Sequence, residues 1–229
     1  MRKLVISLGV LAVLLAAADR VAAAVAETKI SDRVAASYQL PAKPDVTIQG
    51  FPFLTQVLTG DYQEVDVSVS RVAVGSIGLT QLNARLDGVH ASLAQLLQGG
   101  MSAVTADRAS GSAVIPYPEL AAWLPHGVRL SRAGRDVRLS GSVHLLGTRI
   151  PLSGTATPSV TGNGIRVVPH GFTVGGGIGL PPGAVASRLG VVIPLTNLPL
   201  HLRIASIAVT GTGLRAGAAA RDVRFTGGG

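Results

Sequence analysis

The residues that could carry acid–base, nucleophilic or metal chemistry are few and scattered in this chain. The five histidines are spread along the sequence, and none has a second histidine at the spacing of helical metal ligands. The runs Ser110–Ser112 and Ser140–Ser142 are strand-like and lack the Gly-x-Ser-x-Gly pattern of a nucleophile elbow. We therefore predict no catalytic residues and no metal site, and we do not expect an enzyme.

Two further motifs have simpler explanations than chemistry. The glycine-rich run Gly175–Gly179 is not followed by a Lys-Ser/Thr pair and fits no dinucleotide fingerprint, so we interpret it as a flexible loop. Asp61, Glu64 and Asp66 cluster, but a solvated turn and strand face explains them more simply than an acid–base pair. No cofactor is predicted.

Aromatic side chains are concentrated in one stretch of the chain. Of the four Phe, three Tyr and one Trp, Phe51, Phe53 and Tyr62 lie within Gly50–Val74, and Tyr38 lies just upstream. Because aromatic side chains carry much apolar area, this stretch is expected to anchor a core or to line a cavity for the acyl chains of an amphipathic ligand. Residue types alone favour the core slightly.

Positive charge is concentrated in the second half of the chain. Residues 1–127 hold 9 basic and 10 acidic side chains, whereas residues 128–229 hold 11 arginines and only Asp136 and Asp222. The second half is therefore expected to meet anionic partners such as lipid head groups or acidic glycans, unless the arginines only solubilise strand faces. Nucleic acid is not expected, because few aromatic residues are interleaved with these arginines.

The N-terminal 24 residues have the features of a targeting segment. Arg2 and Lys3 precede Leu4–Ala18, an uncharged run of 15 residues, which fits a signal peptide better than the roughly 20 residues of a spanning helix. Ala16–Ala18 and Ala22–Ala24 offer small residues for cleavage, and an uncleaved segment would remain as an N-terminal membrane anchor. In either case we predict that the remainder is exported to the periplasm or cell envelope.

The elements that must position any site are one amphipathic helix and many strands. A stripe formed by Ala23, Ala26, Ile30 and Val34 predicts a helix that covers one side of a sheet. The long alternating strands and glycine-rich turns then predict an antiparallel α+β domain.

We expect a single domain over residues 25–226 and a disordered tail over residues 227–229. The main predicted elements are strands at Asp45–Gln49, Glu64–Val74, Leu79–Leu86 and Val104–Tyr117, helices at Pro118–Leu124 and Pro181–Leu189, a meander over 128–157, and a final strand pair, Leu200–Thr210 and Leu214–Phe225, with a bulge after Ser206.

The order of short motifs resembles a known family. The most specific piece is Gly50-Phe51-Pro52-Phe53-Leu54-Thr55-Gln56. It is followed by Val104-Thr105-Ala106-Asp107-Arg108-Ala109, by the Ser140 to Gly154 hairpin, and by Leu180-Pro181-Pro182 and Ile193-Pro194-Leu195. Together they resemble the LmeA-type family of actinobacterial cell-envelope phospholipid-binding proteins, over nearly all residues beyond the signal segment.

The resemblance implies a fold and a function that composition does not show. It implies an elongated, curved antiparallel sheet wrapped on a long N-terminal helix, similar to tubular lipid-binding (TULIP-like) domains. It also implies non-catalytic binding or transfer of an anionic phospholipid similar to phosphatidylinositol, in support of lipoglycan assembly. The partners implied are this lipid, the membrane surface and an envelope glycosyltransferase.

We predict that the aromatic stretch lines an apolar lipid tunnel. The predicted lining residues are Phe51, Phe53, Leu54, Val57 and Leu58, with Tyr38 and Trp123 nearby. The alternative is a structural scaffold protein that stabilises an envelope enzyme without holding a ligand. In that case the same side chains would fill a dry core.

Overall fold

Contacts within the chain group it into two compact units. The computed structural model describes residues 2–37, 39–74, 77–92, 104–124, 126–145, 148–161, 164–174, 178–179, 191–194 and 203–224. Unit 1 comprises Met1–Ser70, Asn83–Ser110 and Ala220–Gly229, and unit 2 comprises Arg71–Leu82 and Gly111–Ala219. The single domain expected over residues 25–226 stays a prediction, and the expected tail lies outside the described residues.

The described elements are helices and antiparallel strands. In chain order they are α1 (Arg2–Ser37), β1 (Asp45–Gln49), α2 (Phe53–Thr59), β2 (Asp61–Val74), β3 (Ile77–His90), β4 (Thr105–Pro116), α4 (Tyr117–Ala121), β5 (Val128–Ala133), β6 (Asp136–Leu145), β7 (Thr148–Thr161), β8 (Gly164–Val174), β9 (Ile178–Gly179), β10 (Val191–Pro194), β11 (Arg203–Val209) and β12 (Gly213–Arg224).

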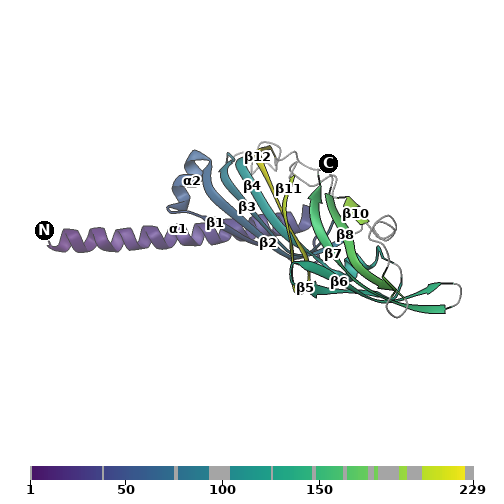
Figure 1. Cartoon of the computed structure of the whole chain (residues 1–229). Helices are drawn as coiled ribbons and strands as arrows, with labels where there is room; N and C mark the ends of the chain where they lie inside the picture. The colour runs from purple at the N-terminus through teal and green to yellow at the C-terminus, as the bar shows by residue number, and fades with distance from the viewer. Residues whose placement is uncertain are drawn as a thin grey trace. The chain divides into compact units, whose positions relative to one another are not determined.

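The strands pair in two open sheets. One has the order β1-β2-β3-β4-β12-β11, and the other has the order β10-β8-β7-β6-β5, with β9 paired to β8. The strands are curved and the first helix is long (Figure 1). This arrangement confirms the predicted antiparallel α+β class and is consistent with a TULIP-like fold.

Helix α1 has an exposed apolar half and a half that packs on unit 1. The 36-residue helix as a whole is long and apolar enough to cross a membrane by length and composition, and in its apolar half Leu4, Val13 and their apolar neighbours are exposed. Figure 1 shows this half extending beyond α2 and β1. From Asp19 onward the helix is attached: Ala23 is buried, and Ala26 and Ile30 pack against the core of unit 1, as the predicted stripe requires.

Two hydrogen bonds fix the second half of α1 to the region of β1. The Ile48 N–H donates to Glu27 Oε1 over 2.8 Å. The Ser31 hydroxyl donates to the Pro44 carbonyl oxygen over 2.5 Å. Since an edge strand has unpaired backbone groups on one side, these bonds satisfy groups that would otherwise need water or another strand.

Helix α2 was not predicted from the sequence. Pro52 lies at its N-cap, and Gly60 ends it in the left-handed conformation with φ 79°. The Gly60 N–H donates to the Gln56 carbonyl oxygen over 2.8 Å. The helix has one buried side, with Phe53 and Gln56, and one exposed side that carries the apolar residues Leu54 and Leu58. The aromatic stretch therefore runs into a short helix before β2 begins.

The core of unit 1 packs around Phe53 and Tyr62. Their ring centroids are 6.4 Å apart and the rings are tilted by 41°. Aromatic rings prefer such a tilted arrangement to a face-to-face stack. The buried residues packed together with these rings come from α1, from three strands and from the residue after β3, and they are Ala23, Ile48, Val89, Ala91 and Ala106.

Unit 2 has its main core between helix α4 and several strands. Tyr117 and Leu120 of α4 are buried, and the Tyr117 hydroxyl donates to the Thr210 carbonyl oxygen over 2.7 Å. Strands β5 to β7 form the meander predicted over 128–157, and β8 continues it as a further antiparallel strand. The buried members of this core are Ile77, Leu79, Ile115, Tyr117, Leu120, Val137, Ile165 and Leu214.

The final strand pair forms as predicted, with one displaced detail. Strands β11 and β12 pair antiparallel, and their register shifts between Ile204 and Ser206, so the irregularity lies just before Ser206 rather than after it. The structure describes the predicted helix at Pro118–Leu124 as α4, displaced toward Tyr117. The predicted helix at Pro181–Leu189 and most of the glycine-rich run Gly175–Gly179 lie outside the described residues.

Candidate functional site

The residues predicted to line one tunnel fall into separate sets. Phe53 is 5% exposed and Val57 packs beside it, so both belong to the core of unit 1. Leu54 is 42% exposed and Leu58 is 86% exposed, because both lie on the outer side of α2. Phe51 is 61% exposed. The predicted residue Tyr38 lies outside the described residues, and Trp123 belongs to unit 2.

Asp19 explains why the aromatic stretch forms a helix. Its two carboxylate oxygens accept hydrogen bonds from the Phe53 N–H over 3.0 Å and the Leu54 N–H over 2.7 Å. Pro52 has no side chain that could cap α2, so a residue of α1 performs this function. Arg20 donates to Asp19 over 2.9 Å and to the Gly50 carbonyl oxygen over 3.0 Å.

The same contacts keep Asp19 ionised. Burial by itself would raise the pKa of Asp19, but the Leu54 and Phe53 N–H groups and the Arg20 guanidinium lower that pKa below its ordinary value. A carboxylate that accepts two backbone hydrogen bonds at a helix start is a structural cap. We therefore assign Asp19 to the stability of unit 1 rather than to catalysis.

An apolar cavity lies in unit 2, next to Trp123. It has a volume of about 40 Å³, enough for roughly three water-sized groups. Trp123 is 47% exposed and covers part of it. The lining is apolar or aromatic throughout and comes from α4 and its following turn and from β5, β6, β7, β8 and β12: Leu120, Trp123, Leu124, Leu130, Val137, Leu139, Ala156, Val167, Pro169 and Leu214.

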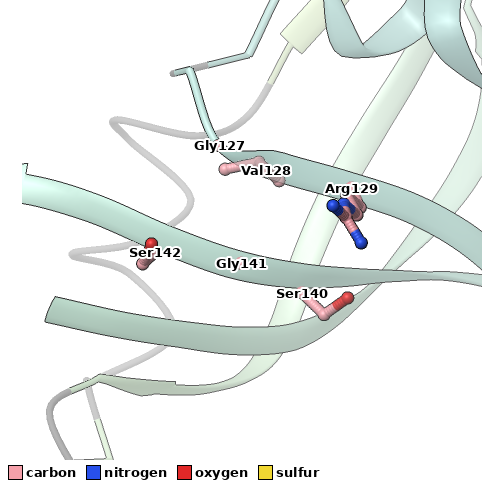
Figure 2. Close-up of a pocket in the computed structure, with 6 residues that line it drawn as sticks. All are labelled: Gly127, Val128, Arg129, Ser140, Gly141 and Ser142. Atoms are coloured by element: carbon pink, nitrogen blue, oxygen red, sulfur yellow. The ribbon is translucent and has the colours of Figure 1, made fainter. Parts of the chain in front are cut away.

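A polar groove lies where β5 begins. Figure 2 shows its lining residues on the two neighbouring strands β5 and β6 and the turn before β5, and the groove has a volume of about 690 Å³. Arg129, Ser140 and Ser142 contribute a guanidinium group and two hydroxyl groups. A guanidinium group and hydroxyl groups are donors that suit a phosphate group.

Two glycines allow the backbones at this groove to approach closely. A Cβ atom built on Gly141 would collide with the Gly127 carbonyl oxygen, and one built on Gly127 would lie 2.6 Å from the Ser142 carbonyl oxygen. Gly127 also has a positive φ of 95°. Larger residues at either position would force the start of β5 away from β6 and change the shape of the groove.

The groove and the cavity are built on one hairpin. Arg129 pairs with Ser140, and the next pair along the same two strands is Leu130 with Leu139. Because successive side chains of a strand point to opposite faces, the polar pair and the apolar pair lie on opposite faces of the β5–β6 hairpin. One hairpin therefore presents an arginine with hydroxyl groups on one face and part of the apolar cavity on the other.

The part of unit 2 that follows residue 128 is rich in positive charge. Seven arginines between residues 128 and 219 have a described exposure, and all seven are exposed. None of the seven forms an ion pair with a carboxylate of the described residues. Uncompensated arginines attract anions, so the predicted charge asymmetry leaves an electropositive surface on unit 2.

Three titratable groups of the described residues, one histidine and two carboxylates, lie close together. Within the described part of the chain, no group of three His, Asp or Glu residues is arranged to hold a metal ion. His90 lies 2.7 Å from Asp61 and 3.4 Å from Asp107. The hydrogen bond to Asp61 is the largest effect and raises the pKa of His90; burial, the next largest effect, opposes it, and the contact with Asp107 raises the pKa further. The side chains of all three residues are at least half exposed, which is typical of a surface ion pair rather than an active site.

Sequence reasoning found only one residue of the cavity. Trp123 was predicted near a lipid site, and it does line the cavity. The alternation of Val137 and Leu139 with Arg138 and Ser140 indicates a strand with one apolar face. That pattern could have suggested the lining, but it does not distinguish a packed face from one beside a cavity.

A comparison with protein families identifies the family of this chain. The model of the LmeA-like phospholipid-binding family matches residues 17–219. The chain belongs to this family. No curated protein and no solved structure gives a significant match. The family is one of phospholipid-binding proteins rather than enzymes, and the exposed apolar helix at the start of the chain is compatible with a signal peptide or an anchor.

Proposed function

We propose that the protein binds an anionic phospholipid in the cell envelope and does not catalyse a reaction. The observation that carries the proposal is the apolar cavity beside Trp123, in a chain of a phospholipid-binding family. A lipid needs an apolar space for its acyl chains and donors for its phosphate. The β5–β6 hairpin offers both surfaces.

The acyl end of the lipid is assigned to the cavity. A volume of about 40 Å³ is too small for a whole acyl chain, so chain entry requires side chains of the lining to move. Movement of Trp123 would give up few buried contacts, because this side chain is already half exposed. Its movement would join the cavity to the surface, and an apolar chain would replace the apolar contacts that the ring gives up.

The head group is assigned to the groove at Arg129. A guanidinium group can donate two parallel hydrogen bonds to a phosphate, and Ser140 lies directly opposite on β6. The surrounding exposed arginines favour an anionic lipid over a zwitterionic one. Transfer of the bound lipid between membranes, and support of lipoglycan assembly together with an envelope glycosyltransferase, extend this proposal and are supported by the family resemblance alone.

A scaffold function is the second candidate, because the described cavity is small and the core of unit 1 is well packed. A scaffold would stabilise an envelope enzyme by direct contact and would hold no lipid. It predicts that another protein co-purifies with this chain and that substitutions in the groove leave the amount of bound lipid unchanged.

Lipid retention by matched arginine variants tests the proposal. The full chain is expressed in a bacterial host and purified from the membrane in detergent, and its lipids are extracted and measured by mass spectrometry. Arg129→Glu places a negative charge in the groove. Arg138→Glu makes the same change on β6, at an exposed arginine that does not line the groove. The apolar helix retains some lipid in every sample, so the difference between the variants is the result.

We expect Arg129→Glu to lower the retained anionic phospholipid several-fold and Arg138→Glu to leave it near the wild-type value. Equal retention in all three proteins, together with a protein partner that co-purifies, would support the scaffold instead. Equal losses in both variants would show a general effect of surface charge and would remove the groove from the proposal.

A further inference from the structure

Three large apolar side chains are exposed together at one end of unit 1. Phe51 is 61% exposed, Leu54 is 42% exposed and Leu58 is 86% exposed. Leu54 and Leu58 are four residues apart on a helix, so they share one side of α2. We call Phe51, Leu54 and Leu58 the α2 patch. Exposed apolar clusters of this kind usually mark a surface that contacts a membrane or another molecule.

The α2 patch is held at the end of the apolar half of α1. Asp19 binds the Phe53 and Leu54 N–H groups, and Arg20 binds the Gly50 carbonyl oxygen. The Arg20 guanidinium carbon lies 5.2 Å from the centroid of the Phe51 ring. Asp19 and Arg20 are the first charged residues after the uncharged run Leu4–Ala18. The patch is therefore fixed to the turn of α1 where the apolar run ends.

The uncharged run is too short to cross a bilayer by itself. Its 15 residues span about 22 Å as a helix, whereas the hydrocarbon core of a bilayer is about 30 Å thick. A short span is accommodated when flanking groups supply further apolar surface or when charged side chains extend to the interface. Val21 and Val25 continue the apolar side of α1 beyond Arg20, with exposures of 64% and 51%.

We propose that the α2 patch inserts into the outer-leaflet interface of the membrane that α1 enters, with Arg20 beside the lipid phosphates. Phe51 and the two leucines supply apolar surface at the depth where the run Leu4–Ala18 ends. The Arg20 guanidinium is half exposed and already bound to the Asp19 carboxylate and a carbonyl oxygen. Its remaining exposed N–H groups can donate to lipid phosphates while these two hydrogen bonds stay in place. This inference concerns unit 1 only and does not require the cavity of unit 2 to hold lipid.

The chain has no cysteine, so a single introduced cysteine can be labelled uniquely. The full chain is reconstituted in vesicles of equal parts phosphatidylcholine and phosphatidylglycerol, with an environment-sensitive fluorophore at Leu58→Cys or Leu54→Cys. Quenching by a lipid with a nitroxide high on its acyl chain reports the depth of the label. Val13→Cys, in the apolar run, is the inserted reference. Ala36→Cys is an exposed reference on the same helix, about 24 Å beyond Arg20.

We expect the labels at Val13, Leu54 and Leu58 to be quenched several-fold more than the label at Ala36. Quenching at Val13 with none at Leu54 or Leu58 overturns the proposal. A blue shift at Leu58 without quenching by the nitroxide lipid means that protein, such as a second copy of the chain, covers the patch, and this also overturns it. If Val13 is not quenched, α1 does not enter the bilayer and the proposal fails with it.

Discussion

Two short helices, α2 in unit 1 and α4 in unit 2, differ in how completely the aromatic side chains around them are packed. Around α2 the aromatic side chains Phe53 and Tyr62 are packed together, and the apolar residues not used in the core are exposed. Around α4, Leu120 is buried but Trp123 is half exposed and covers a cavity. The denser aromatic sequence thus forms the better packed core, and the space for a ligand lies beside the single tryptophan.

This difference shows what aromatic residues do and do not indicate. A run of aromatic residues predicts a large apolar area that must be buried, and Phe53 is buried as expected. It does not predict whether the burial is complete. A cavity arises where side chains from several elements fail to fill the space between them, and this depends on contacts that are distant in the sequence.

The largest effect is expected from shortening α1, because unit 1 depends on Asp19. A chain that begins at Asp19 keeps the cap of α2 and the buried Ala23, whereas a chain that begins at Val25 lacks both. We expect the first to unfold cooperatively on heating in scanning calorimetry and the second to lose the transition of unit 1. Limited proteolysis should then cut the second chain near α2. Equal transitions in both chains would show that the two hydrogen bonds from α2 to Asp19 are dispensable.

A pair of aromatic substitutions should separate the two regions next. Phe53→Ala leaves a cavity in a packed core and should lower the free energy of unfolding by about 3–5 kcal/mol, with lipid retention unchanged. Trp123→Ala should cost less stability, because the side chain is already 47% exposed. It should lower the amount of retained phospholipid. Urea denaturation measures the free energy of unfolding, and mass spectrometry measures the retained lipid. A loss of lipid in Phe53→Ala would indicate that the lipid site lies at the aromatic stretch instead.

The smallest effect is expected from pH, and it should be confined to unit 1. The pKa of His90 is raised, chiefly by the hydrogen bond to Asp61. Its stabilising contribution is therefore fully present below the unfolded pKa, near 6.5, and is lost as the pH rises through the higher folded value. We expect the melting temperature of the wild type to fall slightly over that range relative to His90→Gln. Parallel curves for the two proteins would assign no stability to this exposed pair.

Much of the fold follows from local sequence patterns. The strands β5 to β7 and an irregularity close to Ser206 were predicted, because strand alternation and its interruption are local properties. Helix α2 was missed, because its cap is not local: Asp19 lies 34 residues before Phe53. A helix of seven residues has little intrinsic stability, so only the tertiary contact explains it.

The candidate site was less predictable than the fold. Its lining residues come from α4, the turn that follows it, and five strands, and no spacing in the sequence unites Leu120, Val137 and Leu214. The arginine excess was visible in the composition, but only the strand register places Arg129 opposite Ser140. The resemblance to the family therefore predicted the kind of ligand, whereas the position of the cavity required the structure.

The continuity of α1 has a mechanical consequence for the anchored form of the chain. The helix runs without a break for 36 residues, about 54 Å. It contains no proline and only Gly9 as a glycine, so it lacks the residues at which helices usually bend. A flexible tether would let unit 1 tumble and drift away from the bilayer. A stiff helix instead fixes its height and its rotation about the helix axis, so that a tilt of the membrane segment turns unit 1 by the same angle.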